Sequence, residues 1–193
     1  MNLKELLIQR RSYRKFDASK KLSQEDIEAI LQSISYASSA NNRQYLRFLS
    51  IEDDKKVQEV FNITKWGASL PNNMGQPKEG EEPVYFVAPL YDPKQVMKFN
   101  GIDQGLVISN MTLTAYERGI GSCIIGNFNH KKLREILPID PSMECDVLIA
   151  FGYPAIESTL KDISLDQDQS YYLDEKGEYI VPKYKFQEIV TKI

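Results

Sequence analysis

The segment 103–118 constrains the fold more than any other part of the chain, because its apolar residues do not keep to one face of a helix. They are spread around the helix axis: Leu106, Val107, Ile108, Met111, Leu113 and Ala115. A helix that is apolar on every side must be buried, either inside a core or between two subunits. It ends at Gly119-Ile120-Gly121, a glycine signal typical of helix C-termini.

The rest of the chain alternates between helical and strand-like patterns. Apolar spacing predicts helices near the N-terminus, after Ser23, around 57–61 and after Asn129, with Ser23 and Asn129 as N-caps. Strands are expected at 47–51, 84–90, 122–126 and 145–151. The segment 62–83 carries three glycines and three prolines and is expected to form a long irregular loop.

Composition narrows the possible function classes. The 193 residues suit one domain, and 24 Lys and Arg against 27 Asp and Glu give a net charge of −3. Such a chain is not a general binder of nucleic acids or anionic membranes. The N-terminus has charges where a signal peptide is apolar, and no apolar run approaches a membrane span, so a cytoplasmic location is expected. Cys123 and Cys145 form no CxxC pair, so neither a disulfide scaffold nor a metal site is expected.

Two basic motifs lie near opposite ends of the chain. They are Arg10-Arg11-Ser12-Tyr13-Arg14-Lys15 and Pro182-Lys183-Tyr184-Lys185. Forked guanidinium donors beside hydroxyls suit a phosphate monoester, although such charge runs also occur on plain solvated surfaces. If the fold brings the termini together, as domains often do, the two motifs could hold one phosphate.

Further along the chain, the sequence favours catalysis by a bound cofactor over catalysis by side chains. The polar run Ser38-Ser39-Ala40-Asn41-Asn42-Arg43-Gln44 is either a helix-ending loop or a set of neutral groups for the edge of a heteroaromatic ring. The glycines from Gly119 to Gly126 follow a helix and open a strand, the reverse of a dinucleotide-binding fingerprint. His130 is the only histidine, and no Ser/His/Asp set or spaced carboxylate pair is evident. An enzyme of this composition is expected to rely on a cofactor.

Taken in order, these segments resemble the nitroreductase-like FMN enzymes over nearly the whole chain. The segment 10–16 is similar to the family's RRSxRxF motif, and 38–48 is similar to its PSxxNxQPWxF segment. The stretch 103–128 is similar to the family's central region around GIGSC, and 182–185 to its C-terminal basic P(K/R)x(K/R) motif. The chain departs from the family at Ser38, where the family has proline, and at Tyr45-Leu46, where it has Pro-Trp.

The resemblance implies an α+β nitroreductase-like fold, with a central antiparallel-rich mixed sheet flanked by helices. It implies a single FMN-binding domain over 1–193 that forms an intertwined homodimer, with 155–193 as a subunit-wrapping C-terminal arm. The implied cofactor residues fall into three groups at the subunit interface. The phosphate and ribityl group would be held by Arg10, Arg11, Ser12, Arg14, Lys183 and Lys185. The other subunit would contribute Ser38, Ser39, Asn42 and Gln44, and the isoalloxazine ring would be lined by Ile124, Ile125, Gly126 and Asn127.

The implied activity is that of an NAD(P)H oxidoreductase. Hydride or electrons would pass from NADH or NADPH through FMN to nitroaromatic, quinone or related small acceptors by a ping-pong mechanism, with no obligatory catalytic side chain. Trp66, the only tryptophan, either covers the acceptor pocket as a substrate-binding residue or anchors the 62–83 loop. Two other functions stay open: a flavoprotein reductase specific for one metabolite, and a non-enzymatic phosphate- or nucleotide-binding domain.

Overall fold

The two most apolar strands form the middle of the central sheet. In the computed structural model, which describes residues 1–96 and 99–193, the strand order is β1-β2-β4-β3. The strands are β1 (Arg47–Ile51), β2 (Tyr85–Leu90), β3 (Gly121–Ile125) and β4 (Leu148–Gly152). Every residue of β2 and β4 is buried, as expected for strands that are covered on both faces. The four strands that the sequence predicts are therefore confirmed, with small shifts at their ends.

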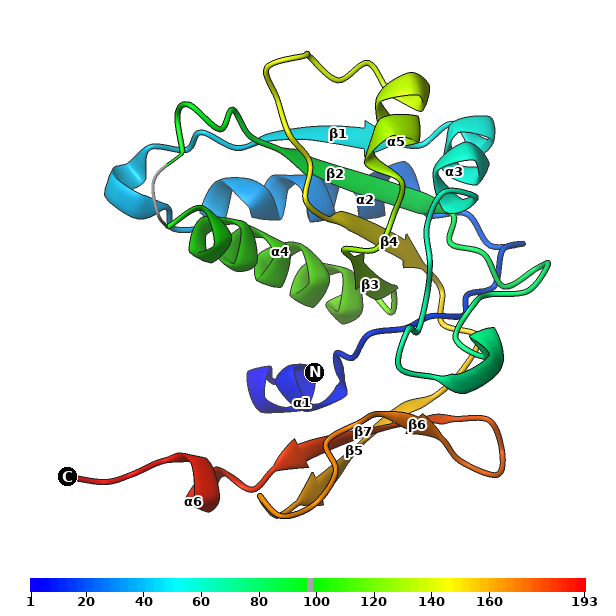
Figure 1. Cartoon of the computed structure of the whole chain (residues 1–193), viewed down its shortest axis with the longest axis vertical. Coiled ribbons are helices and arrows are strands. Elements are labelled where there is room, and N and C mark those ends of the chain that lie inside the picture. Colours follow the sequence, from blue (N-terminus) through cyan, green and yellow to red (C-terminus); the bar gives the residue numbers. More distant parts are fainter. Residues whose placement is uncertain (97–98) are drawn as a thin grey trace.

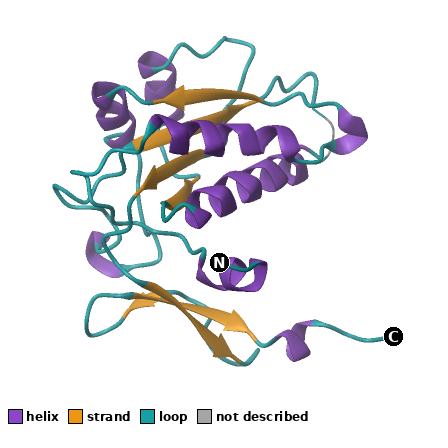
Figure 2. Cartoon of the chain, turned by 180° about the vertical axis from the view of Figure 1, so that it is seen from behind, coloured by secondary structure: helices purple, strands orange, loops and turns teal. Residues whose placement is uncertain are grey.

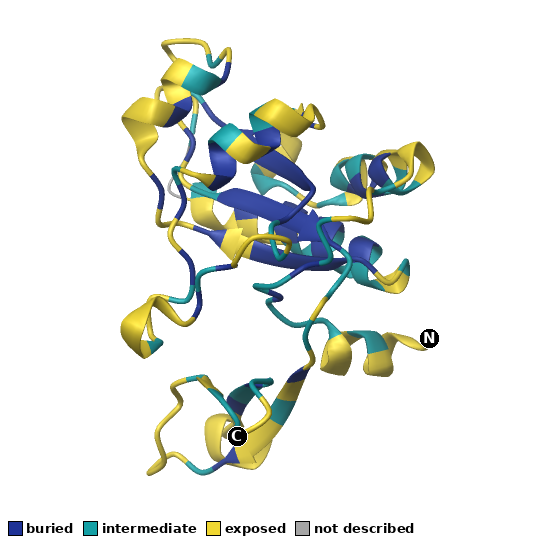
Figure 3. Ribbon diagram, turned by 90° about the vertical axis from the view of Figure 1, so that its right-hand side faces the viewer, coloured by how far each residue is buried: buried dark blue, intermediate teal, exposed yellow. Residues whose placement is uncertain are grey.

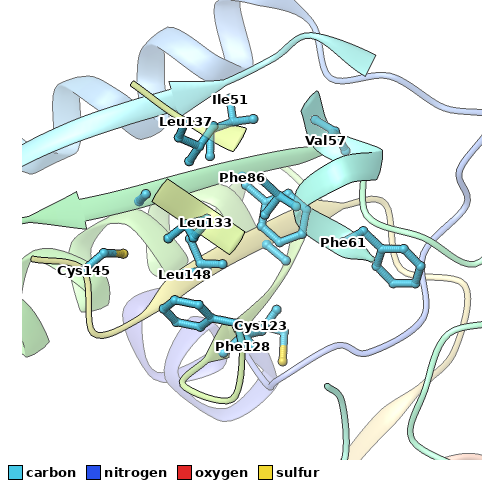
Figure 4. Packing of buried hydrophobic residues seen from close by; sticks show 14 of the residues in the cluster. Ile51, Val57, Phe61, Phe86, Cys123, Phe128, Leu133, Leu137, Cys145 and Leu148 are labelled. Carbon is cyan, nitrogen blue, oxygen red and sulfur yellow. The ribbon is translucent and has the colours of Figure 1, made fainter. Parts of the chain in front are cut away.

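Helices cover both faces of this sheet and divide the core into two layers. On one face lie α3 (Asp54–Phe61) and α5 (His130–Ile136), which pack against Phe86 and Leu148 (Figures 1 and 4). On the other face lie α2 (Gln24–Gln32) and α4 (Asn100–Glu117), which pack against Tyr85 and Ile149 (Figure 2). Neighbouring residues of β2 and β4 thus serve opposite layers, because side chains alternate along a strand.

The predicted helix caps are confirmed by hydrogen bonds. The side chain of Ser23 accepts from the backbone N–H of Asp26 at the start of α2, and Asn129 accepts from that of Lys132 at the start of α5. Short 3-10 turns cover Ser33–Tyr36, Ala40–Asn42 and Pro71–Asn73. In the described part of the chain, no helix combines the length and hydropathy that a bilayer crossing requires.

The helix predicted to be buried all round is α4, and it is only partly covered. Its inner side is buried against the sheet and α2. Ile102 and Leu106 remain 59% and 42% exposed, and no atom lies within 4 Å of where a Cβ would stand on Gly101 or Gly105. An apolar strip of α4 is therefore exposed on the single chain. Its exposure is compatible with the burial between two subunits that the sequence analysis allows.

The N-terminal segment 10–16 follows α1 (Leu3–Gln9) and runs along the edge of β3. The N–H of Tyr13 donates to the carbonyl of Ser122 over 2.9 Å, which forms a one-residue parallel bridge between Ser12 and Ser122. Further on, the carbonyl of Lys15 accepts from the N–H of Ala155 at 3.0 Å. The segment thus covers part of a sheet edge that would otherwise be open.

The C-terminal part forms a second sheet that the sequence does not predict. It contains β5 (Ser158–Ile163), β6 (Tyr172–Leu173) and β7 (Tyr179–Tyr184), in the order β5-β7-β6, followed by α6 (Phe186–Ile189). Figure 3 shows this sheet below the main body, with many exposed residues. It contacts α1 of its own chain through β5. Residues 165–170 and 185–193 are exposed throughout.

The expectation of a mixed central sheet is wrong, because its four strands pair only in the antiparallel sense. Parallel pairing occurs between β5 and β7 in the second sheet, and at the Ser12–Ser122 bridge on the edge of the first.

We expect Gly152→Ala to destabilise the protein by about 1–3 kcal/mol, because overpacking a filled core forces side chains to move. A Cβ on Gly152 would lie 2.9 Å from Cδ1 of Phe16 and 3.0 Å from its Cβ and Cγ, and Phe16 is fully buried. Urea unfolding monitored by circular dichroism measures the change. Gly126→Ala is the control, since nothing lies within 4 Å of its Cβ position; equal losses in the two variants would contradict this account of the packing.

Candidate functional site

The basic N-terminal motif carries guanidinium groups whose donors are not all used. Arg10 and Arg11 are half-buried, and their Nε atoms are buried with no hydrogen-bond partner among the described residues. Burial lowers the pKa of both guanidinium groups, and the charge of Arg10 adds to the lowering at Arg11. A buried donor without an acceptor costs about 1–3 kcal/mol. An anion at this place would remove that cost.

Arg14 joins the N-terminal motif to the C-terminal sheet. Its Cζ atom lies 4.2 Å from the ring centroid of Tyr171 and 5.2 Å from that of Tyr179. Its Nη1 donates to the carbonyl of Ser12 at 3.4 Å. No carboxylate of the described residues forms an ion pair with it, so its charge is available to a ligand.

The second basic motif lies at the end of β7, the strand whose Tyr179 contacts Arg14. Lys183 is exposed, and its side chain has no hydrogen bond or ion pair among the described residues. Lys185 follows the strand, and its Nζ donates to Oγ of Ser164 at 3.3 Å. The structure therefore brings Arg14, from one end of the chain, against the first residue of β7, and Lys183 lies four residues further along that strand.

The polar run 38–44 lies elsewhere, at the start of α4. The N–H of Ala40 donates to both carboxylate oxygens of Asp103, at 3.0 and 3.2 Å, and Asp103 is only 2% exposed. Within the loop, Nε2 of Gln44 donates to Oδ1 of Asn42 at 2.9 Å. Asp103 thus fixes the backbone of this loop, a role that sequence spacing alone does not reveal.

Three residues of this loop adopt left-handed backbone conformations although none is glycine. The φ angles are 52° at Asn41 and Asn42 and 48° at Gln44. Such conformations cost about 1–3 kcal/mol each and are concentrated at ligand-binding sites. Gln44 is the most unusual of the three, because asparagine adopts this conformation more readily than other residues that carry a Cβ.

A cavity of about 320 Å³ opens beside this loop. Ser38, Ser39 and Gln44 line it together with apolar side chains of α2, β1 and α4. Tyr45 also lines it, and burial, together with the nearby Asp103 carboxylate, raises the pKa of this tyrosine to about 12. The hydroxyl of Tyr45 therefore stays protonated and neutral at physiological pH.

The segment 124–127 lies at the end of the edge strand β3 and is largely open. Ile124 is 46% exposed, Gly126 and Asn127 are exposed, and no atom lies within 4 Å of a Cβ position on Gly126. Ile125 differs from the other three because its side chain is buried in the core beside α5. Only the backbone of Ile125 can therefore face a ligand here.

Trp66 lies in the core at the base of the 62–83 loop. It is 5% exposed, packs near Phe16 and Phe61, and its Nε1 donates to Oγ1 of Thr64 at 2.7 Å. The neighbouring Lys65 N–H donates to the carbonyl of Asn127 at 2.8 Å. This arrangement holds the loop base against the end of β3, as an anchoring tryptophan would.

Within one chain, the two halves of the candidate site do not meet. Tyr13 stacks on Tyr116 near the C-terminal end of α4, with ring centroids 5.9 Å apart, whereas the loop 38–44 is bound to Asp103 near its N-terminal end. With a rise of 1.5 Å per residue, these two points on α4 lie about 20 Å apart. A single chain thus presents the basic half and the amide-rich half at opposite ends of one helix.

Comparison with known proteins agrees with this architecture. The model of the nitroreductase family matches residues 7–153. A protein of Archaeoglobus fulgidus, whose name refers to NADH dehydrogenase and NAD(P)H nitroreductase activity, is 29% identical over 156 residues, which cover 79% of this chain and 85% of that protein. An FMN reductase (NADPH) of Bacillus subtilis is 24% identical over 173 residues, covering 80% of this chain and 66% of that protein.

Solved structures agree on the fold. A nitroreductase with bound FMN from Bacteroides fragilis has a TM-score of 0.65 and 24% identity, over 90% of this chain and all of that one. Because the family model spans most of the chain, from the first basic motif to the end of the central sheet, the chain belongs to the nitroreductase family of oxidoreductase enzymes.

Proposed function

We propose that this protein is a homodimeric FMN-dependent oxidoreductase that takes electrons from NADH or NADPH and passes them to nitroaromatic, quinone or related small acceptors. The observation that carries the proposal is the set of guanidinium donors without partners beside the start of β3, the strand that leads to the exposed residues 124–127. Arg10, Arg11 and Arg14 provide the positive charge there, and the exposed backbone around Gly126 provides a surface for a flat ring.

The donor set suits the flavin phosphate. An FMN phosphate carries nearly two negative charges, and it would supply acceptors for the buried Nε atoms of Arg10 and Arg11. Charge-assisted hydrogen bonds contribute about 1.5–3 kcal/mol each. Ser12 adds a hydroxyl within the same segment, and Lys183 and Lys185 add charge from β7 and the residue after it.

The end of β3 suits the ring system. Ile124, Gly126 and Asn127 form an exposed, partly apolar edge, and the loop base at Lys65 fixes Asn127 through its carbonyl. Bound FMN supplies hydride and electron transfer between NAD(P)H and an acceptor. The contribution of the chain is to bind, orient and cover the flavin; the only histidine, His130, lies on α5 and is assigned no role in it.

The second half of the site would come from a second copy of the chain. The strip of α4 around Ile102 and Leu106 is apolar and open, so pairing two such helices would bury it. The loop 38–44 would then contribute Ser38, Ser39, Asn42 and Gln44 to the flavin of the other subunit. The exposed apolar residues of 186–193 suit an arm that lies on that subunit, while β5–β7 remain with their own chain.

Removing one of the proposed phosphate contacts tests the cofactor site. We expect Arg10→Ala to yield a folded but colourless protein, because the half-buried cation that would meet the phosphate is removed. Flavin absorbance of the purified protein measures bound FMN, and circular dichroism confirms folding. Lys4→Ala is the control, since Lys4 is exposed on the preceding helix. Unchanged flavin content in Arg10→Ala would remove Arg10 from the site.

In the proposed site, flavin binding and dimer formation depend on each other. Three or four charge-assisted bonds fall short of the ~12 kcal/mol that nanomolar binding needs once the loss of freedom on association is included. Contacts from the second subunit must supply the rest. We therefore expect Leu106→Arg to give monomers that release FMN, because an unpaired charge cannot be buried cheaply.

Light scattering coupled to size exclusion and flavin absorbance measures both properties of Leu106→Arg at once. Leu165→Arg is the matched control, because Leu165 is 55% exposed but lies outside α4. A monomer that keeps its FMN would disprove the link between dimer and flavin.

The proposed ping-pong mechanism has a kinetic signature. If the reductant and the acceptor use the same face of the flavin in turn, double-reciprocal initial-rate plots at several acceptor concentrations should be parallel. Assays with NADH and with NADPH against a nitroaromatic and a quinone give these plots. Intersecting lines would show that both substrates are bound together.

A further inference from the structure

Asp103 is a buried carboxylate whose hydrogen bonds go to the loop 38–44 and not to a cation. It stands in the first turn of α4 and is only 2% exposed. Both of its oxygens accept from the backbone N–H of Ala40, at 3.0 and 3.2 Å, across 63 positions of the sequence. Among the described residues, no lysine or arginine forms an ion pair with it. The positive end of the α4 dipole and this one amide therefore stabilise its charge.

In the part of the chain that the structure describes, this contact is the only hydrogen-bonded link between the loop and a distant segment. All other hydrogen bonds of the loop stay within residues 39–47. The N–H of Asn42 donates to the carbonyl of Ser39 at 2.9 Å, and the N–H of Gln44 donates to Oγ of Ser39 at 3.2 Å. The loop thus sets its own shape, whereas the carboxylate sets its position on α4.

A carboxylate at this position is costly for the fold. Burying a charged group costs free energy that a neutral side chain of the same size would not cost. The loop that it holds also contains left-handed backbone, with φ at 48° in Gln44, and such conformations persist only where the surrounding structure enforces them. The position of the loop therefore accounts for Asp103 better than the stability of α4 does.

In the proposed dimer, this loop belongs to the flavin site of the other subunit. The loop contacts α4 at Asp103, whereas the basic segment contacts it at Tyr116, about 20 Å away along the helix axis. Removing the Asp103 carboxylate should therefore disturb the flavin site to which its chain contributes the loop. The basic half of the site on its own chain should remain in place.

We propose that Asp103 is a positioning residue that acts across the subunit boundary, because it fixes the loop that meets the flavin of the other subunit. The inference rests on the proposed function, which brings the loop 38–44 of one chain to the flavin held by the other. Arg10, in contrast, belongs to the flavin site of its own chain. Defects at Arg10 and at Asp103 therefore fall into different sites when one chain carries both, and into the same site when two chains carry one each.

The first part of the experiment measures FMN binding to the full-length protein stripped of flavin. Titrations followed by flavin fluorescence give Kd for wild type, Asp103→Ala, Asp103→Asn and the control Glu117→Ala. We expect Asp103→Ala to raise Kd at least roughly tenfold, because the loop loses its link to α4. Asp103→Asn keeps one acceptor oxygen and should lie between Asp103→Ala and wild type. Glu117 is an exposed carboxylate at the other end of α4, so its removal should leave Kd unchanged.

The second part uses hybrid dimers of an Arg10→Ala chain and an Asp103→Ala chain. The two chains are produced together with different affinity tags, and the hybrid is isolated by purification on both tags. In the hybrid, one site combines both defects and the other has neither. We expect the hybrid to bind half as much FMN as the wild-type dimer, with the wild-type Kd. The restored site requires a folded Asp103→Ala chain, so this result separates a positioning role from a general role in folding.

The outcomes separate the two proposals. A wild type that does not bind FMN overturns the proposed function and this inference with it. A wild type that binds FMN, together with a folded Asp103→Ala variant that binds it equally well, overturns the inference alone. A hybrid that binds no FMN although both chains fold overturns the action across the subunit boundary.

Circular dichroism and thermal unfolding test the fold of each variant. If Asp103→Ala does not fold, Asp103→Asn replaces it in both parts of the experiment. We then expect Kd for FMN to rise roughly threefold, because only one of the two acceptor oxygens remains. Wild-type affinity in Asp103→Asn would in that case overturn the inference.

Discussion

The candidate site depends on the backbone pairing between the N-terminal segment 10–16 and the edge of the central sheet. The hydrogen bond from Tyr13 to Ser122 and the one from Ala155 to Lys15 fix this segment at two points. Between them, alternate side chains face opposite ways: Tyr13 packs against Tyr116, whereas Arg14 meets the C-terminal sheet. The pairing that covers the edge of β3 thus also places these cations near the start of β3. This strand leads to the exposed residues 124–127.

Helix α4 sets the second constraint, because it separates the two halves of the site. Asp103 and its loop lie about 20 Å along α4 from the basic segment beside Tyr116, and a rigid helix cannot bring the two together. Two copies related by a twofold axis, as in the proposed dimer, would solve this problem, since antiparallel pairing of α4 would place the start of one helix near the end of the other. The uncovered residues Ile102 and Leu106 lie where such pairing would need apolar contact.

Local features of this fold could be predicted from the sequence, and features that depend on distant contacts could not. The caps at Ser23 and Asn129 and the apolar runs of β2 and β4 are properties of neighbouring residues, so they are visible in the pattern. The sheet formed by β5–β7 was missed because few of its residues are buried. Within the candidate site, the basic motifs could be identified by composition, but the bond between Asp103 and Ala40 and the stacking of Arg14 on Tyr171 join residues far apart in the chain.

The buried polar atoms that lack partners show where a single chain is incomplete. Among the described residues, the side-chain atoms of this kind belong to Arg10, Arg11, Ser158 and Tyr179 near one end of α4, and to Tyr45 and Asn100 near the other. Each such atom lowers the stability of the isolated chain by about 1–3 kcal/mol. A ligand or a second subunit that satisfies them binds the folded state alone and therefore stabilises it in proportion to the logarithm of its concentration. The buried polar atoms that lower the stability of the isolated chain thus lie at the two ends of α4. A cofactor and a second copy of the chain would contribute most to stability there.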